Sequence, residues 1–174
     1  MLHTNKSAIS AAYSWGGSTL FLAVFAILTA LGIQYFGGIA PCALCLEQRT
    51  AYYIAVPLLF LALVLVSADR GRLAGLLFFA VALAFLMNAG LGVYHAGAEW
   101  KFWPGPDTCG ATAQSITGTA RNLLTELDKA RVVRCDEPAL VVFGLSLAGW
   151  NVVASLMLFI ASLKAAFLSP GRNQ

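Results

Sequence analysis

Long apolar segments alternate with short polar ones along the whole chain. Four of these segments reach the roughly 20 residues that a helix needs to cross the hydrocarbon core of a membrane. They cover residues 15–36, 46–67, 73–95 and 139–163, and the more polar remainder is residues 96–138. The pattern predicts an all-α membrane protein, with residues 1–174 forming a single domain. Its expected fold is a four-transmembrane-helix bundle in which both termini lie on one side of the membrane.

Composition supports this class of protein. The chain is 59% hydrophobic and 11% charged, whereas a soluble domain usually has about 25% charged residues. The net charge of +3 is small, and because no basic cluster is present we expect no nucleic-acid partner. The first apolar segment is longer than the core of a signal peptide and no small-residue cleavage site follows it, so we expect it to be retained.

Basic residues alone do not decide the orientation. The termini and the turn between the second and third segments carry five of them, which places these parts in the cytoplasm: Lys6, Arg70, Arg72, Lys164 and Arg172. The long loop carries five more: Lys101, Arg121, Lys129, Arg131 and Arg134. All four cysteines fall on the loop side of this topology, namely Cys42, Cys45, Cys109 and Cys135. An even number of thiols on one face indicates an oxidising compartment, which is the bacterial periplasm or an equivalent lumen.

A Cys-x-x-Cys pair, Cys42 and Cys45, stands where the second apolar segment begins. The free N–H groups and the positive dipole end of a helix start stabilise a thiolate there and lower its pKa. Arg49 follows Cys45 by four residues, hence by one helical turn on the same face. Its guanidinium is therefore placed to stabilise a thiolate, or an anion formed on an electron acceptor. The alternative is an arginine that extends to the lipid headgroups.

The loop cysteines, Cys109 and Cys135, are 26 positions apart. One interpretation is a structural disulfide that stabilises the loop by about 3 kcal/mol. The other is a redox pair that exchanges with the Cys-x-x-Cys pair. Apolar residues within 116–132 predict a short helix between them, lying on the membrane surface or packing over the bundle. Zinc is not expected, because only one of the two cysteine pairs is closely spaced.

Three polar residues stand inside the apolar segments: Gln34, Asn88 and Asn151. Such groups normally form hydrogen bonds between transmembrane helices, which is the role we predict for them. His95 ends the third segment on the cysteine side, where it either approaches a bound acceptor or is an ordinary interfacial histidine.

Residues 15–163 resemble the bacterial disulfide bond formation protein B (DsbB) family, the quinone-linked membrane thiol oxidases. The resemblance rests on the four apolar segments and on three stretches: "PCALCLEQR", "YHAGAEWKFWPGPDTC" and "CDEPALVVFGLSLAGWN". It implies disulfides Cys42–Cys45 and Cys109–Cys135, in a multi-pass protein of the inner membrane with cytoplasmic termini and periplasmic cysteine loops.

The resemblance also implies a path for electrons. A soluble thioredoxin-like dithiol oxidase (DsbA-like) attacks Cys109, and the mixed disulfide is resolved by Cys135 or by the partner's second thiol. Electrons then pass to the Cys42–Cys45 pair, and Cys45 gives them to a membrane quinone, either ubiquinone or menaquinone. Arg49 stabilises the charge that forms, and His95 lies near the quinone head.

Two other functions are compatible with parts of this pattern. Vitamin K epoxide reductase-like enzymes also link cysteine pairs to a quinone, but their Cys-x-x-Cys belongs to a late helix and their loop pair comes earlier. The order here is the reverse, which argues against that family. The remaining alternative is a non-enzymatic membrane scaffold whose disulfides only staple the loop.

Overall fold

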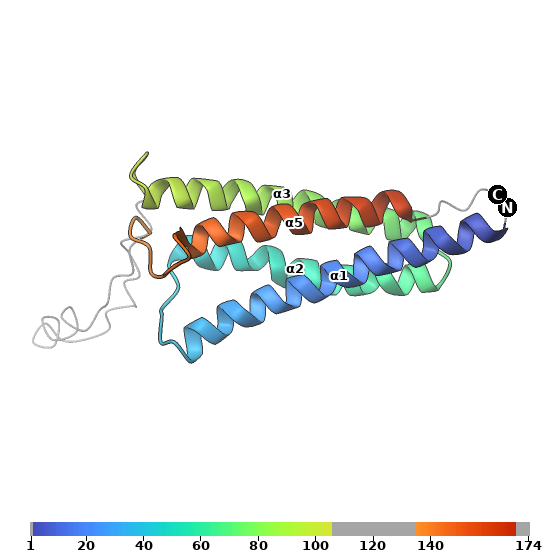
Figure 1. Ribbon diagram of the computed structural model, residues 1–174, viewed down its shortest axis with the longest axis horizontal. Helices are drawn as coiled ribbons and strands as arrows, with labels where there is room; N and C mark the ends of the chain where they lie inside the picture. The colour runs from blue at the N-terminus through green and yellow to red at the C-terminus, as the bar shows by residue number, and fades with distance from the viewer. Residues whose placement is uncertain (1, 106–134, 170–174) are drawn as a thin grey trace, which may run out of the picture.

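The computed structural model describes residues 2–105 and 135–169, with side chains from residue 9 onward. Its four long helices are α1 (Leu2–Tyr35), α2 (Ala43–Ser67), α3 (Gly71–Glu99) and α5 (Leu147–Leu168) (Figure 1). Each contains a span that is long and apolar enough to cross a membrane. The predicted four-helix membrane fold is therefore confirmed.

The helices form a closed bundle in which each packs against two neighbours. α1 and α3 each contact both α2 and α5. The start of α1, the end of α5 and the turn between α2 and α3 lie at one end of the bundle (Figure 1). The start of α2, the end of α3 and the start of α5 lie at the other end, and this is the end that carries the cysteines.

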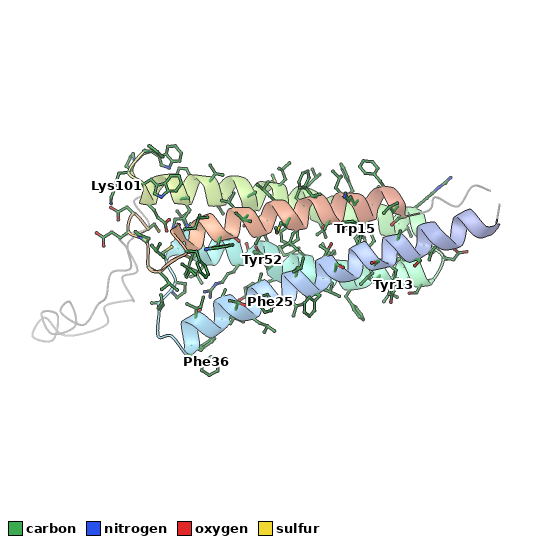
Figure 2. All side chains as sticks on the ribbon, viewed as in Figure 1. Tyr13, Trp15, Phe25, Phe36, Tyr52 and Lys101 are labelled. Atoms are coloured by element: carbon green, nitrogen blue, oxygen red, sulfur yellow. The ribbon has the colours of Figure 1, made fainter. Side chains whose placement is uncertain are left out.

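The bundle is apolar both inside and outside. Phe78, Phe85 and Leu59 are fully buried between the helices. Yet Phe21 and Met87 are 70% and 78% exposed, and Phe36, just after the end of α1, projects outward (Figure 2). A helix that is hydrophobic all round needs an apolar environment on its outer face as well, so this exterior matches a lipid environment.

Hydrogen bonds join the few polar groups inside the bundle. Asn88 Nδ2 donates to Ser155 Oγ at 2.9 Å, and Tyr52 OH donates to Asn151 Oδ1 at 2.8 Å. Arg49 donates to Gln34 Oε1 on α1. The prediction that Gln34, Asn88 and Asn151 bond between helices is thus confirmed.

The predicted start of the fourth helix at residue 139 is wrong. Before α5 the chain forms a hairpin in which β1 (Val141–Val142) pairs antiparallel with β2 (Leu145–Ser146). Phe143 and Gly144, between the strands, have φ angles of 53° and 82°, and such left-handed conformations belong to a tight hairpin turn rather than a helix. Ser146 then caps α5, with its Oγ accepting a hydrogen bond from the Gly149 N–H at 3.2 Å.

Helices α2 and α3 are longer than predicted at the cysteine end. α2 begins at Ala43 rather than residue 46, so Cys45 lies in its first turn. α3 continues to Glu99 rather than ending at 95, which places His95 one turn inside the helix. Cys109 and the helix predicted within 116–132 lie outside the described residues.

Two adjacent glycines of α1 give a matched test of the packing. A Cβ on Gly16 would lie 2.6 Å from Phe78 Cζ and 3.0 Å from Leu63 Cδ2, whereas one on Gly17 would meet nothing within 4 Å. Gly16→Ala should lower the free energy of unfolding by about 1–3 kcal/mol through overpacking. Gly17→Ala should be neutral or stabilising by roughly 0.5–1 kcal/mol, because alanine favours the helix. Thermal unfolding in detergent measures both variants, and equal effects would contradict the packing described here.

Candidate active site

Cys42 is the capping residue of α2. Its backbone is extended, with φ −76° and ψ 171°, and its Sγ accepts a hydrogen bond from the Cys45 N–H at 3.3 Å. The preceding chain reaches this point through Gly38, whose φ of 65° favours glycine. A sulfur in the cap position takes up one of the unpaired N–H groups of the helix start. The predicted location of Cys42 at a helix N-terminus is confirmed.

Cys42 and Cys45 are two free thiols in this structure rather than the predicted disulfide. Their Sγ atoms lie 2.9 Å apart in a hydrogen bond, compared with about 2.05 Å in a disulfide. Cys42 is 5% exposed, while Cys45 is half-buried. The structure therefore presents the reduced form of the pair, and the disulfide stays a prediction for its oxidised form.

His95 reaches Cys42 from α3. Its Nε2 lies 3.6 Å from Cys42 Sγ and 3.8 Å from Glu99 Oε1, one turn further along α3. On the other side of the ring, Gln48 Nε2 lies 3.1 Å from His95 Nδ1. When Gln48 donates to Nδ1, the proton of the neutral ring lies on Nε2. His95 then donates this proton to the sulfur of Cys42.

Cys135, near the C-terminal end of the long loop, lies close to Cys42 and His95. It is disulfide-bonded and 1% exposed. Its Sγ, the Sγ of Cys42 and a ring nitrogen of His95 lie within 4.8 Å of one another. The fold thus brings a cysteine of the loop pair against the first cysteine of the Cys-x-x-Cys pair, which is the arrangement that thiol–disulfide exchange requires.

Polar contacts hold the chain around Cys135 against the bundle. Lys101 Nζ donates to both the backbone oxygen and Oδ2 of Asp136, each at 2.7 Å. Trp150 Nε1 on α5 donates to the Val142 oxygen of the hairpin at 3.0 Å. The Lys101–Asp136 pair is partly exposed and contributes little free energy, but together these contacts link the residues after Cys135 to the ends of α3 and α5.

The pKa of Cys42 is lowered to about 4. The largest cause is the hydrogen bond with the Cys45 side chain; burial opposes it, and His95 and the Cys45 N–H add to it. A thiol with this pKa is a thiolate at neutral pH, and the thiolate is the nucleophile in disulfide exchange. Cys42 is therefore the activated sulfur of the pair.

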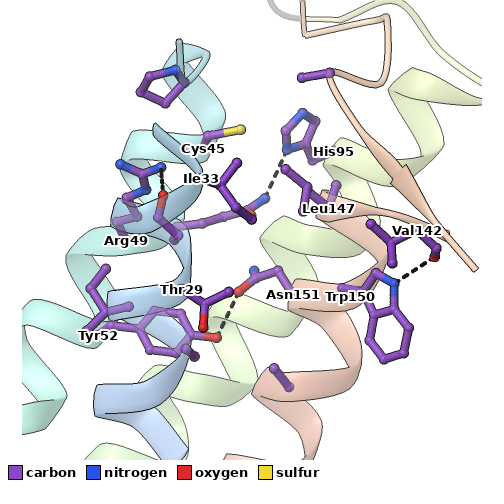
Figure 3. Close-up of a pocket in the computed structure, with 18 of the residues that line it drawn as sticks. Thr29, Ile33, Cys45, Arg49, Tyr52, His95, Val142, Leu147, Trp150 and Asn151 are labelled. Carbon is purple, nitrogen blue, oxygen red and sulfur yellow. Dashed lines mark hydrogen bonds between the residues drawn. The ribbon is translucent and has the colours of Figure 1, made fainter. Parts of the chain in front are cut away.

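A largely apolar pocket of about 490 Å³ adjoins the two thiols. It lies between α1, α2 and α5, and Figure 3 shows Cys45, His95 and Tyr52 around it. Phe25 and Met157 also line it, and both are 61% exposed on the outer surface of the bundle. The pocket is therefore bordered by side chains that face the lipid.

Cys45 and Arg49 line this one pocket, as their spacing predicts, but the described residues show no hydrogen bond between the two side chains. The Cys45 sulfur is directed toward His95 (Figure 3). The Arg49 guanidinium turns to α1, where it donates to Gln34 Oε1 and, at 3.3 Å, to the Ala30 oxygen. α1 thus fixes the positive charge at the pocket wall instead of against the sulfur.

Three functional candidates were missed from the sequence: Gln48, Tyr52 and Glu99. Cys45, Gln48, Arg49 and Tyr52 follow the i, i+3, i+4, i+7 spacing of one helix face, and all four line the pocket. That periodicity was available in the sequence as a signal for Gln48 and Tyr52. Glu99 carried no such signal, because it fell beyond the predicted end of the third helix.

The lowered pKa of Cys42 predicts an unusual alkylation profile. In the reduced protein, its rate of reaction with iodoacetamide should stay nearly constant from pH 8 to pH 6 and fall only as the pH drops through about 4. An ordinary thiol, with a pKa of about 8.5, loses about tenfold per pH unit over the same range. Mass spectrometry that resolves fragment ions separates Cys42 from Cys45 within their shared peptide and gives the rate at Cys42 alone.

Cys45→Ala is the matched control, since it removes the largest cause of the shift. Its Cys42 should regain a pH-dependent rate between pH 6 and pH 8. A tenfold loss per unit in the unmodified protein over this range would contradict the assignment of Cys42 as the activated thiol.

Comparison with known proteins identifies a family for this chain. The family model described as "Disulfide bond formation protein DsbB" matches residues 14–165. The chain is also similar to uncharacterized protein RP370 of Rickettsia prowazekii (strain Madrid E), at 21% identity over 140 residues, covering 80% of this chain and 78% of the relative. No solved structure matches it. Because the family model spans most of the sequence, the chain belongs to the DsbB family of membrane proteins of disulfide bond formation.

Proposed function

We propose that this protein is a membrane thiol:quinone oxidoreductase. It reoxidises a periplasmic DsbA-like dithiol oxidase and passes the electrons to ubiquinone or menaquinone in the bacterial inner membrane. One observation carries the proposal: the sulfur of Cys135 lies within 4.8 Å of the sulfur of Cys42. The partner thiol of Cys42, Cys45, in turn borders a pocket on the lipid side.

The first step is exchange between the soluble partner and the loop disulfide. A thiolate of the reduced partner attacks Cys109, which lies outside the described residues, and Cys135 leaves as a thiolate. Cys135 is then buried beside Cys42. With the inner pair oxidised, this thiolate attacks Cys42 Sγ, so that a Cys42–Cys135 bond forms and Cys45 leaves as a thiolate. No electrons are lost, because each step exchanges one disulfide for another.

His95 and the N-terminus of α2 stabilise the negative charge that forms on Cys42 during this exchange. After the partner's second thiol has released Cys109 from the mixed disulfide, the Cys109 thiolate attacks Cys135 of the Cys42–Cys135 bond, and Cys42 becomes the leaving sulfur. The negative charge on Cys42 is then met by the Nε2 of His95 and by the Cys45 N–H. Gln48 holds the ring in the orientation that permits this. Because the sulfurs of Cys42 and Cys135 are buried, water competes little for the hydrogen bonds to Cys42, and these bonds are correspondingly strong.

The pocket suits the head group of a quinone. Its volume of about 490 Å³ lies within the roughly 300–1,000 Å³ of small-molecule sites. Its lining is mainly apolar, and its polar groups include Arg49, Gln48 and the Tyr52–Asn151 pair, together with Thr29, His95, Glu99 and Glu137. A quinone supplies an acceptor for two electrons and two protons. Arg49 provides a fixed positive charge that stabilises anionic character at the pocket wall.

A turnover assay tests the proposal. The purified protein, a reduced thioredoxin-like dithiol oxidase and a short-chain quinone analogue are mixed, and the quinone absorbance is followed. The unmodified protein should consume the quinone, and Cys45→Ser should abolish this because the thiol next to the pocket is gone. A single-cysteine partner should still be trapped by Cys45→Ser as a mixed disulfide, but not by Cys109→Ala. A disulfide-stapled scaffold would show no quinone consumption in any variant.

Arg49→Ala separates the two half-reactions. Because the guanidinium lines the pocket but lies away from Cys135, kcat/KM for the quinone should fall by about 100-fold. Formation of the mixed disulfide with the partner should stay unchanged. Arg49→Lys keeps the charge but loses the fork that binds Gln34 and Ala30, so it should retain part of the quinone activity. Equal loss in both half-reactions would count against the role given to Arg49.

A further inference from the structure

Three metal-binding side chains meet at the cysteine end of the bundle, namely Cys42, Cys135 and His95. We propose that the fully reduced protein binds a zinc-type divalent ion through these three residues, with Cys45 as the fourth ligand after its side chain rotates. The spacing of the cysteines disfavours a four-cysteine zinc site, because it offers only one close pair. The fold replaces the missing close pair with one loop cysteine, Cys135, and a histidine from α3.

The distances fit a tetrahedral ion. Zinc–sulfur bonds of about 2.3 Å place tetrahedral sulfur ligands roughly 3.8 Å from one another. The Cys42 and Cys45 sulfurs are 2.9 Å apart, and Cys42 Sγ is 3.6 Å from His95 Nε2. Cys135 Sγ lies within 4.8 Å of both Cys42 Sγ and a ring nitrogen of His95. Cys45 lies outside this group of three, but its sulfur is directed toward His95 (Figure 3), so rotation of its side chain would bring it to the ion.

A buried carboxylate adds a second reason to expect a cation. The Glu99 side chain is 5% exposed, and its Oε1 lies 3.8 Å from His95 Nε2. Its Oε2 is buried and has no hydrogen-bond partner among the described residues. A buried polar atom without a hydrogen-bond partner is unfavourable. This unpartnered oxygen beside a proposed ligand is a second observation that points to a bound cation.

Gln48 is placed to hydrogen-bond to the ring of His95, one of the proposed metal ligands. A histidine that binds zinc through Nε2 normally donates its Nδ1–H to a fixed acceptor. The Gln48 side-chain amide lies 3.1 Å from Nδ1, and rotation of the amide by half a turn presents its oxygen there instead of its nitrogen. The same residue thus serves the metal-free and the metal-bound ring.

Binding depends on the redox state. Cys135 is disulfide-bonded in this structure, so the site forms only after a dithiol or a phosphine supplies two electrons and two protons to that bond. The ion then displaces the remaining thiol protons and occupies the sulfurs that carry out exchange. Zinc would hold the reduced protein inactive, and this inference does not require a quinone.

Cobalt is the spectroscopic probe. The full-length protein in detergent is reduced with a phosphine that competes weakly for metal, and Co²⁺ is added. We expect sulfur-to-cobalt charge-transfer bands and the visible bands of a tetrahedral ion, both displaced by Zn²⁺. The oxidised protein should show neither set of bands. Absence of these bands from the reduced protein would overturn the proposal.

Single-residue variants test which side chains bind the ion. Cys135→Ser and His95→Ala should each weaken Co²⁺ binding by at least about 100-fold. Loss of a residue that only hydrogen-bonds to a metal ligand already lowers metal affinity by about 10–100-fold, and loss of a ligand itself should cost more. Cys109→Ser is the matched control: it removes the other loop cysteine and should leave binding unchanged under the same reductant. Bands that need Cys109 but survive His95→Ala would show a four-cysteine site and refute the one proposed. Circular dichroism confirms that each variant is folded.

Discussion

The approach of two sulfurs, those of Cys42 and Cys135, is the contact on which the whole active end depends. It requires three separate features of the fold. α2 must begin at Cys42, so that the sulfur caps the helix and receives the Cys45 N–H. α3 must extend to Glu99, so that His95 reaches the same sulfur. The chain around Cys135 must be held over the bundle, through Lys101 and the hairpin before α5.

The first turn of α2 gives its two sulfurs different surroundings. Cys42 is buried and meets Cys135 and His95. Cys45 is half-buried, and both cysteines line the pocket, whereas Cys135 does not. Two thiols three residues apart thereby lie between the contact with Cys135 and a cavity bordered by exposed apolar side chains. α1 completes the arrangement, because its Gln34 and Ala30 fix the Arg49 guanidinium at the cavity wall.

The sequence predicted the features that depend on local pattern. Runs of about 20 apolar residues identified the four helices, and Cys-x-x-Cys at the start of one of them placed Cys42 at a helix N-terminus. Residues 139–146 were assigned to a helix because a short apolar run looks the same in a strand, and the turn at Phe143 and Gly144 decides between them. The meeting of Cys42, His95 and Cys135 depends on contacts between distant segments, which no local pattern contains.

A protein that retains only Cys42 and Cys135 offers the most direct measurement of the central contact. In the double variant Cys45→Ser, Cys109→Ser, mild oxidation should join Cys42 to Cys135 in nearly every molecule. Non-reducing peptide mass spectrometry, after any free thiols have been alkylated, would detect the linked peptides. Recovery of both cysteines as separately alkylated peptides would show that the two sulfurs do not meet, and would contradict the proposed path of exchange.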